Sequence, residues 1–241
     1  MQAHKKVLIA AAVMASLFGL ACSKQESASD AILRSRGTLI DAVTPVGTGV
    51  PFYTVTTLNP TWEADGPIVR IPEMKWTDHN DISQNQSLFL HKTTVVAFVF
   101  TSCSGFCPVV IQELKKVEKA AKHFDNVQFV VFTVDPEFDT PSRLKSFAQT
   151  YEVDRENWFF LTASKPQIHS LIRDTFASQV IQKDLANGRD FVHAGHFYLF
   201  DDSARLRAVL NGTEVSVAAK SQTVLESLKL SRQNSLHTKP L

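Results

Sequence analysis

Apolar and polar residues occur in blocks along the chain, and the blocks predict a series of strands and helices. Three runs are apolar without regular polar alternation, which is typical of strands covered on both faces: Thr94–Phe100, Val127–Val134 and Trp158–Leu161. Between the first two runs, apolar residues recur at helical spacing and predict one buried helix face: Val110, Leu114, Val117 and Ala121.

The second half of the chain continues the same alternation. Thr140 or Asp139 as N-cap, followed by Pro141, predicts a helix from Pro141 to about Tyr151. Three further elements are predicted in chain order: a helix around Ile168–Phe176, a β-hairpin of His196–Phe200 and Leu206–Leu210, and a helix from about Thr213 to Leu230.

An added hairpin is predicted before the first buried strand. Ile71–Trp76 has the pattern of a short strand, Thr77–Asp81 that of a turn, and Gln86–Leu90 that of a return strand. The element order predicts an α/β fold in which a mixed central sheet is flanked by helices on both faces.

The N-terminus has the pattern of an export signal. Basic side chains precede an apolar run, Val7–Ala21, that is too short for a comfortable membrane span. The run ends at Cys22, which resembles a lipoprotein site where the Cys is lipidated, although Leu20 stands two residues before it instead of three. The alternatives are a plain secretory signal and an uncleaved anchor. Each of them takes the chain out of the cytoplasm.

Composition suggests the domain boundaries. We expect a signal peptide at 1–21, a polar tether and N-terminal arm at 22–67, the folded domain at 68–230 and a disordered tail at 231–241. The formal net charge is +1 and no basic stripe is present, so we expect no nucleic-acid partner.

Two of the three cysteines form a pair, Cys103-Ser-Gly-Phe-Cys107-Pro108, directly after the first buried strand. Thiols at the start of a helix face the positive end of its dipole, which favours the thiolate. Thiolates attack disulfides and bind soft metal ions. A dithiol at the first strand-to-helix junction makes the predicted fold thioredoxin-like.

Four interpretations of the pair can be weighed, and two of them are disfavoured. A structural disulfide is disfavoured, because closing so short a loop constrains the unfolded chain little. The functional interpretations are thiol–disulfide exchange and metal binding, in which two thiolates and an imidazole suit both copper oxidation states. A peroxidase is disfavoured, because the proline-led Thr-x-x-Cys pattern is missing.

An imidazole ligand has to come from among eight histidines. His193 and His196 directly precede or begin an apolar strand. On a continuous strand they point to opposite faces, so they cannot both bind one ion unless Gly195 kinks the chain. The others are expected to be ordinary signal, tail, helix-surface or hairpin residues: His4, His79, His91, His123, His169 and His237.

Four segments, in order, resemble the Sco/SenC family of copper-handling, thioredoxin-like proteins of cytochrome oxidase assembly. The resemblance covers about Ile71 to Leu230, and its segments are Val99–Pro108, Thr133–Pro141, Trp158–Thr162 and Phe191–Asp201. The CxxxCP block and the DPExDTP block together make it specific.

The resemblance implies a copper site formed by Cys103, Cys107 and His193, the histidine five residues before Tyr198. Many family members have Asp where this chain has Val192, which removes an acceptor that could orient the imidazole. Asp135 and Asp139 belong to the second signature, and we expect them to serve loop structure and helix capping.

The resemblance also implies a function. We expect a copper metallochaperone for the CuA centre of a respiratory cytochrome c oxidase, rather than an enzyme, with Cu(I)/Cu(II) as its ion. The alternative is a periplasmic thiol–disulfide oxidoreductase that keeps the CuA-site cysteines reduced. The implied partners are the CuA-bearing subunit and other copper chaperones or thioredoxin-like reductants. The implied location is the periplasmic side of the bacterial inner membrane, reached through a lipid on Cys22 or an anchor.

Overall fold

The structure is a computed structural model, and it describes residues 50–237 except 56–57, 63–65, 186–187 and 193–194. The chain divides into two compact units, Met1–Ser35 and Arg36–Leu241, and every described residue belongs to the second.

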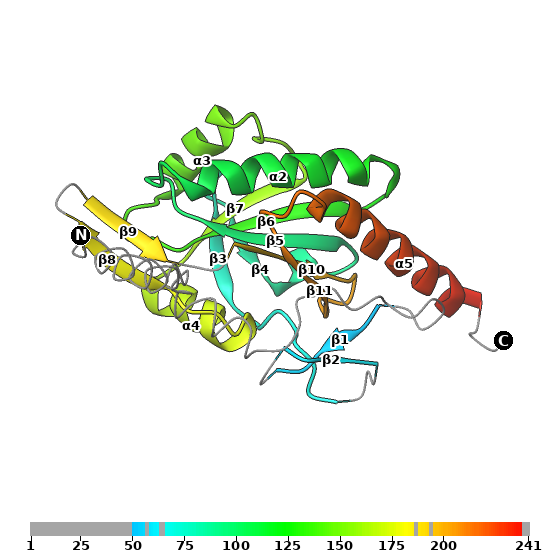
Figure 1. Cartoon of the computed structure of the whole chain (residues 1–241). Coiled ribbons are helices and arrows are strands. Elements are labelled where there is room, and N and C mark those ends of the chain that lie inside the picture. Colours follow the sequence, from blue (N-terminus) through cyan, green and yellow to red (C-terminus); the bar gives the residue numbers. More distant parts are fainter. Residues whose placement is uncertain (1–49, 56–57, 63–65, 186–187, 193–194, 238–241) are drawn as a thin grey trace, which may run out of the picture. The chain divides into compact units, whose positions relative to one another are not determined.

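A seven-stranded mixed sheet forms the centre of this unit, in the order β11-β10-β5-β6-β7-β3-β4 (Figure 1). The three central strands are parallel: β5 (Thr93–Val99), β6 (Val127–Thr133) and β7 (Trp158–Thr162). The outer strands are antiparallel to their neighbours: β10 (His196–Phe200), β11 (Leu206–Asn211), β3 (Lys75–Asp78) and β4 (Ser83–Asn85). The predicted buried strands thus occupy the middle of the sheet.

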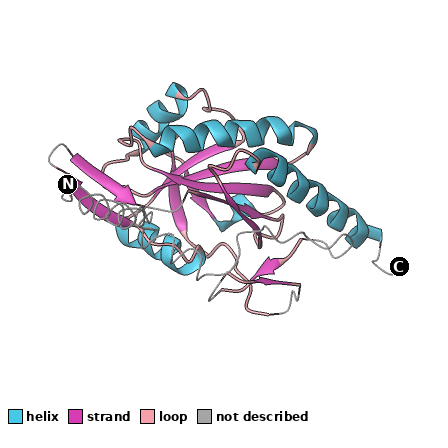
Figure 2. Ribbon diagram, viewed as in Figure 1, coloured by secondary structure: helices cyan, strands magenta, loops and turns pink. Residues whose placement is uncertain are grey.

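Helices cover both faces of this sheet (Figure 2). They are α2 (Phe106–Ala120), α3 (Pro141–Thr150), α4 (Lys165–Thr175) and α5 (Val217–His237), with short 3₁₀ turns η1 (Gln86–Phe89) and η2 (Ala121–His123). The connections from β5 to β6 and from β6 to β7 run through α2 and α3, which lie on one face of the sheet. The return from β7 to β10 places α4 on the other, and α5 packs beside α2. The predicted mixed α/β fold is confirmed.

Local signals explain where α3 and α4 begin. The side chain of Thr140 accepts a hydrogen bond from the Arg143 amide, and Pro141 occupies the first helical position. Ser164 and Gln167 form a capping box at the start of α4. Thr140, and not Asp139, is therefore the N-cap of α3.

The added hairpin exists as β3 and β4, but its predicted bounds were wrong. The carboxylate of Asp78 accepts hydrogen bonds from the Asn80 and Ile82 amides at 2.8 and 2.9 Å, which moves the turn toward the C-terminus. The predicted return strand, Gln86–Leu90, is mostly the 3₁₀ turn η1, because Asn85 caps the Ser87 amide at 2.8 Å.

Two other elements differ from prediction. The strands β8 (Ile181–Leu185) and β9 (Gly188–Val192) form a separate two-stranded sheet that the sequence pattern did not indicate. Helix α5 begins at Val217 and continues to His237, so much of the segment expected to be a disordered tail is helical.

The N-terminal arm is part of the fold from residue 50 onward. Strand β1 (Phe52–Tyr53) pairs with β2 (Pro60–Thr61), and Val50 and Tyr53 are buried. The buried Arg207 of β11 donates hydrogen bonds to the carbonyl oxygens of Val50 and Pro51. The folded region therefore starts well before Ile68, because these carbonyl groups satisfy a buried guanidinium.

Candidate dithiol and metal centre

The cysteine pair lies where β5 passes into α2. Cys103 precedes the helix and is half-buried, whereas Cys107 lies in its first turn and is fully buried. Both thiols are free. Gly105, the residue before the helix, has φ −112°, a value open to any residue, so no distorted turn requires glycine there.

Backbone amides hold both sulfur atoms. The Cys107 amide donates to Sγ of Cys103 at 3.3 Å, and the Phe100 amide donates to Sγ of Cys107 at 3.5 Å. The first amides of a helix lack intrahelical acceptors, so the Cys103 sulfur takes the place of an N-cap oxygen.

The two thiols differ electrostatically. Burial raises the pKa of Cys107, and although the hydrogen bond from the Phe100 amide opposes this, Cys103 and Asp139 raise it further. The expectation that the helix terminus favours the thiolate therefore fails for Cys107, because burial outweighs the dipole. The pair consists of an accessible sulfur and a protected one.

Asp139 accepts hydrogen bonds from the chain just before the dithiol. Its fully buried carboxylate accepts hydrogen bonds from the Thr101 amide at 3.0 Å, the Thr101 hydroxyl and the Thr133 hydroxyl. Asp135 is also buried, and its carbonyl oxygen accepts from the Asp139 amide at 2.9 Å. The predicted capping role of Asp139 is wrong, while its role in loop structure is confirmed.

His193 lies outside the described residues, but the residues flanking it are placed. The ring of Phe191 packs against that of Phe100, with centroids 5.2 Å apart. Gly195 lies against the ring of Phe106. The chain on both sides of residues 193–194 therefore contacts the segment that carries the two cysteines.

His196 begins β10, and it is half-buried with its ring 6.1 Å from that of Tyr198. Burial lowers the pKa of His196. β10 begins at His196, and Gly195 before it is not part of a strand. The opposite-face argument from the sequence therefore does not apply.

The donor set in the described residues is a dithiol. Within that part of the chain, no three His, Cys, Asp or Glu side chains form a group able to hold a metal ion. Two cysteine sulfurs suit a soft ion such as Cu(I), and a third donor, where one is used, would come from outside the described residues. The residues present fit copper in its reduced state.

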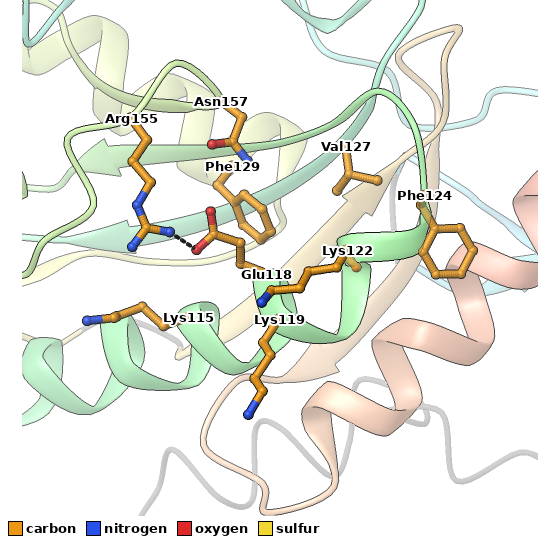
Figure 3. A pocket seen from close by; sticks show the side chains of 10 residues that line it. Lys115, Glu118, Lys119, Lys122, Phe124, Val127, Phe129, Arg155 and Asn157 are labelled. Carbon is orange, nitrogen blue, oxygen red and sulfur yellow. Dashed lines mark hydrogen bonds and ion pairs between the residues drawn. The ribbon is translucent and has the colours of Figure 1, made fainter.

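Two other features lie apart from the dithiol. His79 is buried between Asp154, 3.2 Å from its Nε2, and the Phe160 amide, which donates to its Nδ1 at 3.3 Å. A pocket of about 440 Å³ lies at the other end of α2, lined mainly by Lys115, Lys119, Lys122, Arg155 and Glu118 (Figure 3). Its Glu118 is already paired with Arg155 at 2.7 Å, and the pocket has no Cys or His.

The sequence reasoning missed the contact between Phe106 and Gly195. Each stands inside a motif that was singled out, one between the cysteines and one between the histidines. Sequence spacing cannot pair them, because their contact depends on how β5 and β10 lie beside each other.

No helix of the described residues is long and apolar enough to cross a membrane, and Cys22 lies outside those residues.

Similar proteins support the fold and the family. The SCO1 protein homolog of Bacillus subtilis is 32% identical over 144 residues, which are 58% of this chain and 73% of that protein. The crystal structure of a SCO1/SenC family lipoprotein from Bacillus anthracis has 29% identity and a TM-score of 0.61 over 67% of this chain and 95% of that one.

A third relative resembles the chain in fold. Bradyrhizobium japonicum ScoI, a structure with copper bound, has 21% identity and a TM-score of 0.56, and the match covers 64% of this chain and 96% of that one. The SCO1/SenC family model matches residues 70–228, from just before β3 to near the middle of α5. The chain therefore belongs to the SCO1/SenC family.

Proposed function

We propose that the chain binds copper through Cys103, Cys107 and His193 and serves assembly of the CuA centre of a cytochrome c oxidase. The observation that carries the proposal is the free dithiol at the start of α2. The segment that bears the dithiol contacts Phe191, which precedes His193, and Gly195, which follows it. The Sco family is one of cytochrome c oxidase assembly proteins, and a relative of the same fold holds copper.

The chemistry of the three donors supports this proposal. Two thiolates satisfy Cu(I) in low coordination, and an added imidazole suits Cu(II) as well. The Cys107 amide donates a hydrogen bond to the Cys103 sulfur, and the two cysteine side chains also interact with each other. Oxidation of the pair to a disulfide removes both thiolates, so release of the ion follows the redox state of the dithiol.

The proposed place of action follows from the N-terminal signal. Lipidation at Cys22 holds the domain on the periplasmic side of the inner membrane, where a client oxidase exposes its CuA-bearing subunit. The Bacillus anthracis relative is a lipoprotein, which is consistent with this anchoring.

The test is a Cu(I) titration of the reduced full chain against a chelator of known affinity. We expect one tight copper per chain, weakened by Cys103→Ser and by His193→Ala. His123→Ala changes an exposed histidine at the far end of α2 and is the matched control. Wild-type binding no tighter than that of Cys103→Ser overturns the proposal.

A second candidate function is thiol–disulfide exchange that keeps client cysteines reduced. The half-buried Cys103 beside the fully buried Cys107 favours it, since exchange needs one accessible attacking sulfur and one resolving sulfur. The Cys103 thiolate attacks a client disulfide to form a mixed disulfide. Cys107 then displaces the client thiol, and the pair gives up two electrons and two protons.

His193 separates the two candidates, because exchange needs no imidazole ligand. Each variant is assayed both for reduction of a model disulfide and for restored oxidase activity in cells lacking the protein. If His193→Ala keeps full reductase activity but fails to restore the oxidase, copper binding is the function. If it does both, thiol exchange is.

A further inference from the structure

A pocket of about 440 Å³ lies between the C-terminal half of α2, the turn η2, the start of β6 and the loop before β7 (Figure 3). Helix α2 has 15 residues, so its two ends lie about 20 Å apart, with the dithiol at the other end. No cysteine or histidine lines the pocket, and every residue that does belongs to the described part of the chain. The pocket is therefore separate from the dithiol.

Positive charge reaches this pocket from more than one element. Lys115, Lys119 and Lys122 follow one another at helical spacing along α2 and η2, whereas Arg155 comes from the loop before β7. Cations near a helix C-terminus interact favourably with its dipole, which accounts for Lys119 and Lys122 but not for Arg155. The cluster of cations is therefore a product of the tertiary fold and not of the helix alone.

The one carboxylate that lines the pocket does not offset this charge. Both oxygens of Glu118 are engaged, because Arg155 donates to one at 2.7 Å and the indole of Trp158 donates to the other at 2.9 Å. Within the described residues, neither Lys119 nor Lys122 makes a hydrogen bond or an ion pair, and Figure 3 marks only the bond between Arg155 and Glu118. Two exposed ammonium groups are thus available to a ligand.

One side of the pocket is apolar. Phe124 and Val127 line it and are only half-buried, so they present apolar surface below the cationic side chains. Asn157 adds a side-chain amide, which can donate hydrogen bonds. Cationic groups above an apolar wall suit an anion that carries an apolar part, and the volume of the pocket lies within the usual range of small-molecule sites.

We propose that this pocket binds a phosphate ester whose organic part packs against the apolar wall. Lysine and arginine are the common partners of phosphate oxygens, the ammonium group as a point charge and the guanidinium as a planar fork. Two sources supply the same chemistry: a soluble organic phosphate and the headgroup of an anionic phospholipid. The site does not depend on the proposed copper function.

Phenyl phosphate, titrated by calorimetry into the full chain beside inorganic phosphate, tests the site. We expect saturable binding of phenyl phosphate at least about threefold tighter than that of inorganic phosphate, because only the ester buries apolar surface. Combining Lys119→Gln with Lys122→Gln should weaken it at least about tenfold, because two charge-assisted contacts are lost.

Lys116→Gln is the matched control, since it removes an exposed lysine of the same helix that does not line the pocket. The urea midpoint and the Cu(I) affinity should be the same in all variants, because the lysines are exposed and lie away from the dithiol. If phenyl phosphate binds no tighter than inorganic phosphate, or if the double variant binds it as well as Lys116→Gln does, the proposal is overturned.

Vesicles separate the two sources of phosphate. The full chain is sedimented with phosphatidylcholine vesicles that contain or lack phosphatidylglycerol, and the N-terminal apolar run is common to all variants. A loss of the phosphatidylglycerol-dependent fraction in the double variant, but not in Lys116→Gln, supports the site with a lipid headgroup as its ligand. An unchanged fraction, together with weakened binding of phenyl phosphate, supports the site with a soluble phosphate ester.

Discussion

The Asp139 carboxylate accepts a hydrogen bond from the Thr101 amide at 3.0 Å, across 38 residues of sequence. This bond, with those from the Thr101 and Thr133 hydroxyls, ties the chain just before Cys103 to the loop that follows β6. The position of the dithiol therefore depends on a carboxylate that touches neither thiol.

Replacing the fully buried Asp139 by alanine leaves three donors, two of Thr101 and one of Thr133, without their acceptor. We expect Asp139→Ala to lower the free energy of unfolding by about 3 kcal/mol, measured from urea denaturation at unchanged m-value. Asp125→Ala, at an exposed position, should change it by less than about 0.5 kcal/mol. Equal losses in the two variants would contradict this role of Asp139.

The two cysteines should differ in reactivity. In the reduced protein, we expect iodoacetamide to modify Cys103 at least about tenfold faster than Cys107, because Cys107 is fully buried and burial raises its pKa. Mass spectrometry of the digested protein measures each rate separately. In denaturant the two rates should converge, and similar rates in the folded protein would contradict the structure.

Arg207 should control the docking of the N-terminal arm. Its guanidinium binds the Asp201 carboxylate at 3.0 Å, stacks 4.0 Å from the Phe52 ring and donates to two carbonyl groups of the arm. We expect Arg207→Ala to lower the free energy of unfolding by about 3 kcal/mol. We also expect chymotrypsin to cleave the variant at Tyr53, because the arm is no longer held.

Arg232→Ala serves as the comparison for the arm. It removes an exposed arginine whose ion pair with Asp202 is 3.4 Å long, so cleavage should remain slow. Equally fast cleavage of the wild type at Tyr53 would mean that the arm is not held by Arg207.

Two glycines near the site should respond differently to alanine. A Cβ on Gly212 would lie 2.5 Å from the Gly195 carbonyl oxygen, so the backbone would have to move. We therefore expect Gly212→Ala to lower the free energy of unfolding by about 1–3 kcal/mol. Gly105 has open space and a negative φ, so Gly105→Ala should cost less than about 0.5 kcal/mol even though it lies between the cysteines. Thermal unfolding of the two variants measures the difference.

The centre of the fold could be predicted from the sequence because its strands are covered on both faces. Val95 to Val99 and Val130 to Phe132 are almost completely buried, and a continuous apolar run carries that information locally. Strands β8 and β9 could not be predicted in this way, because their sequences, IQKDL and GRDFV, mix charged and apolar residues.

The dithiol could also be predicted locally, since both cysteines and the following helix are contiguous. The unequal burial of the two cysteines could not be predicted from the sequence. It depends on the hydrogen bond from the Phe100 amide and on the packing around Cys107, which exist only in the folded chain. The same holds for the contact of Phe106 with Gly195 and for the buried carboxylate of Asp139. These depend on long-range register, which the residue types alone do not specify.

The described part of the N-terminal arm docks far from the dithiol. Strands β5 and β10 are antiparallel, with Phe200 opposite Thr94, so Asp201 and the arm bound near it lie at the opposite end of β5 from Cys103. A strand of seven residues separates these ends by about 20 Å. The described arm therefore docks at one end of the central strand, and the half-buried Cys103 follows the other end.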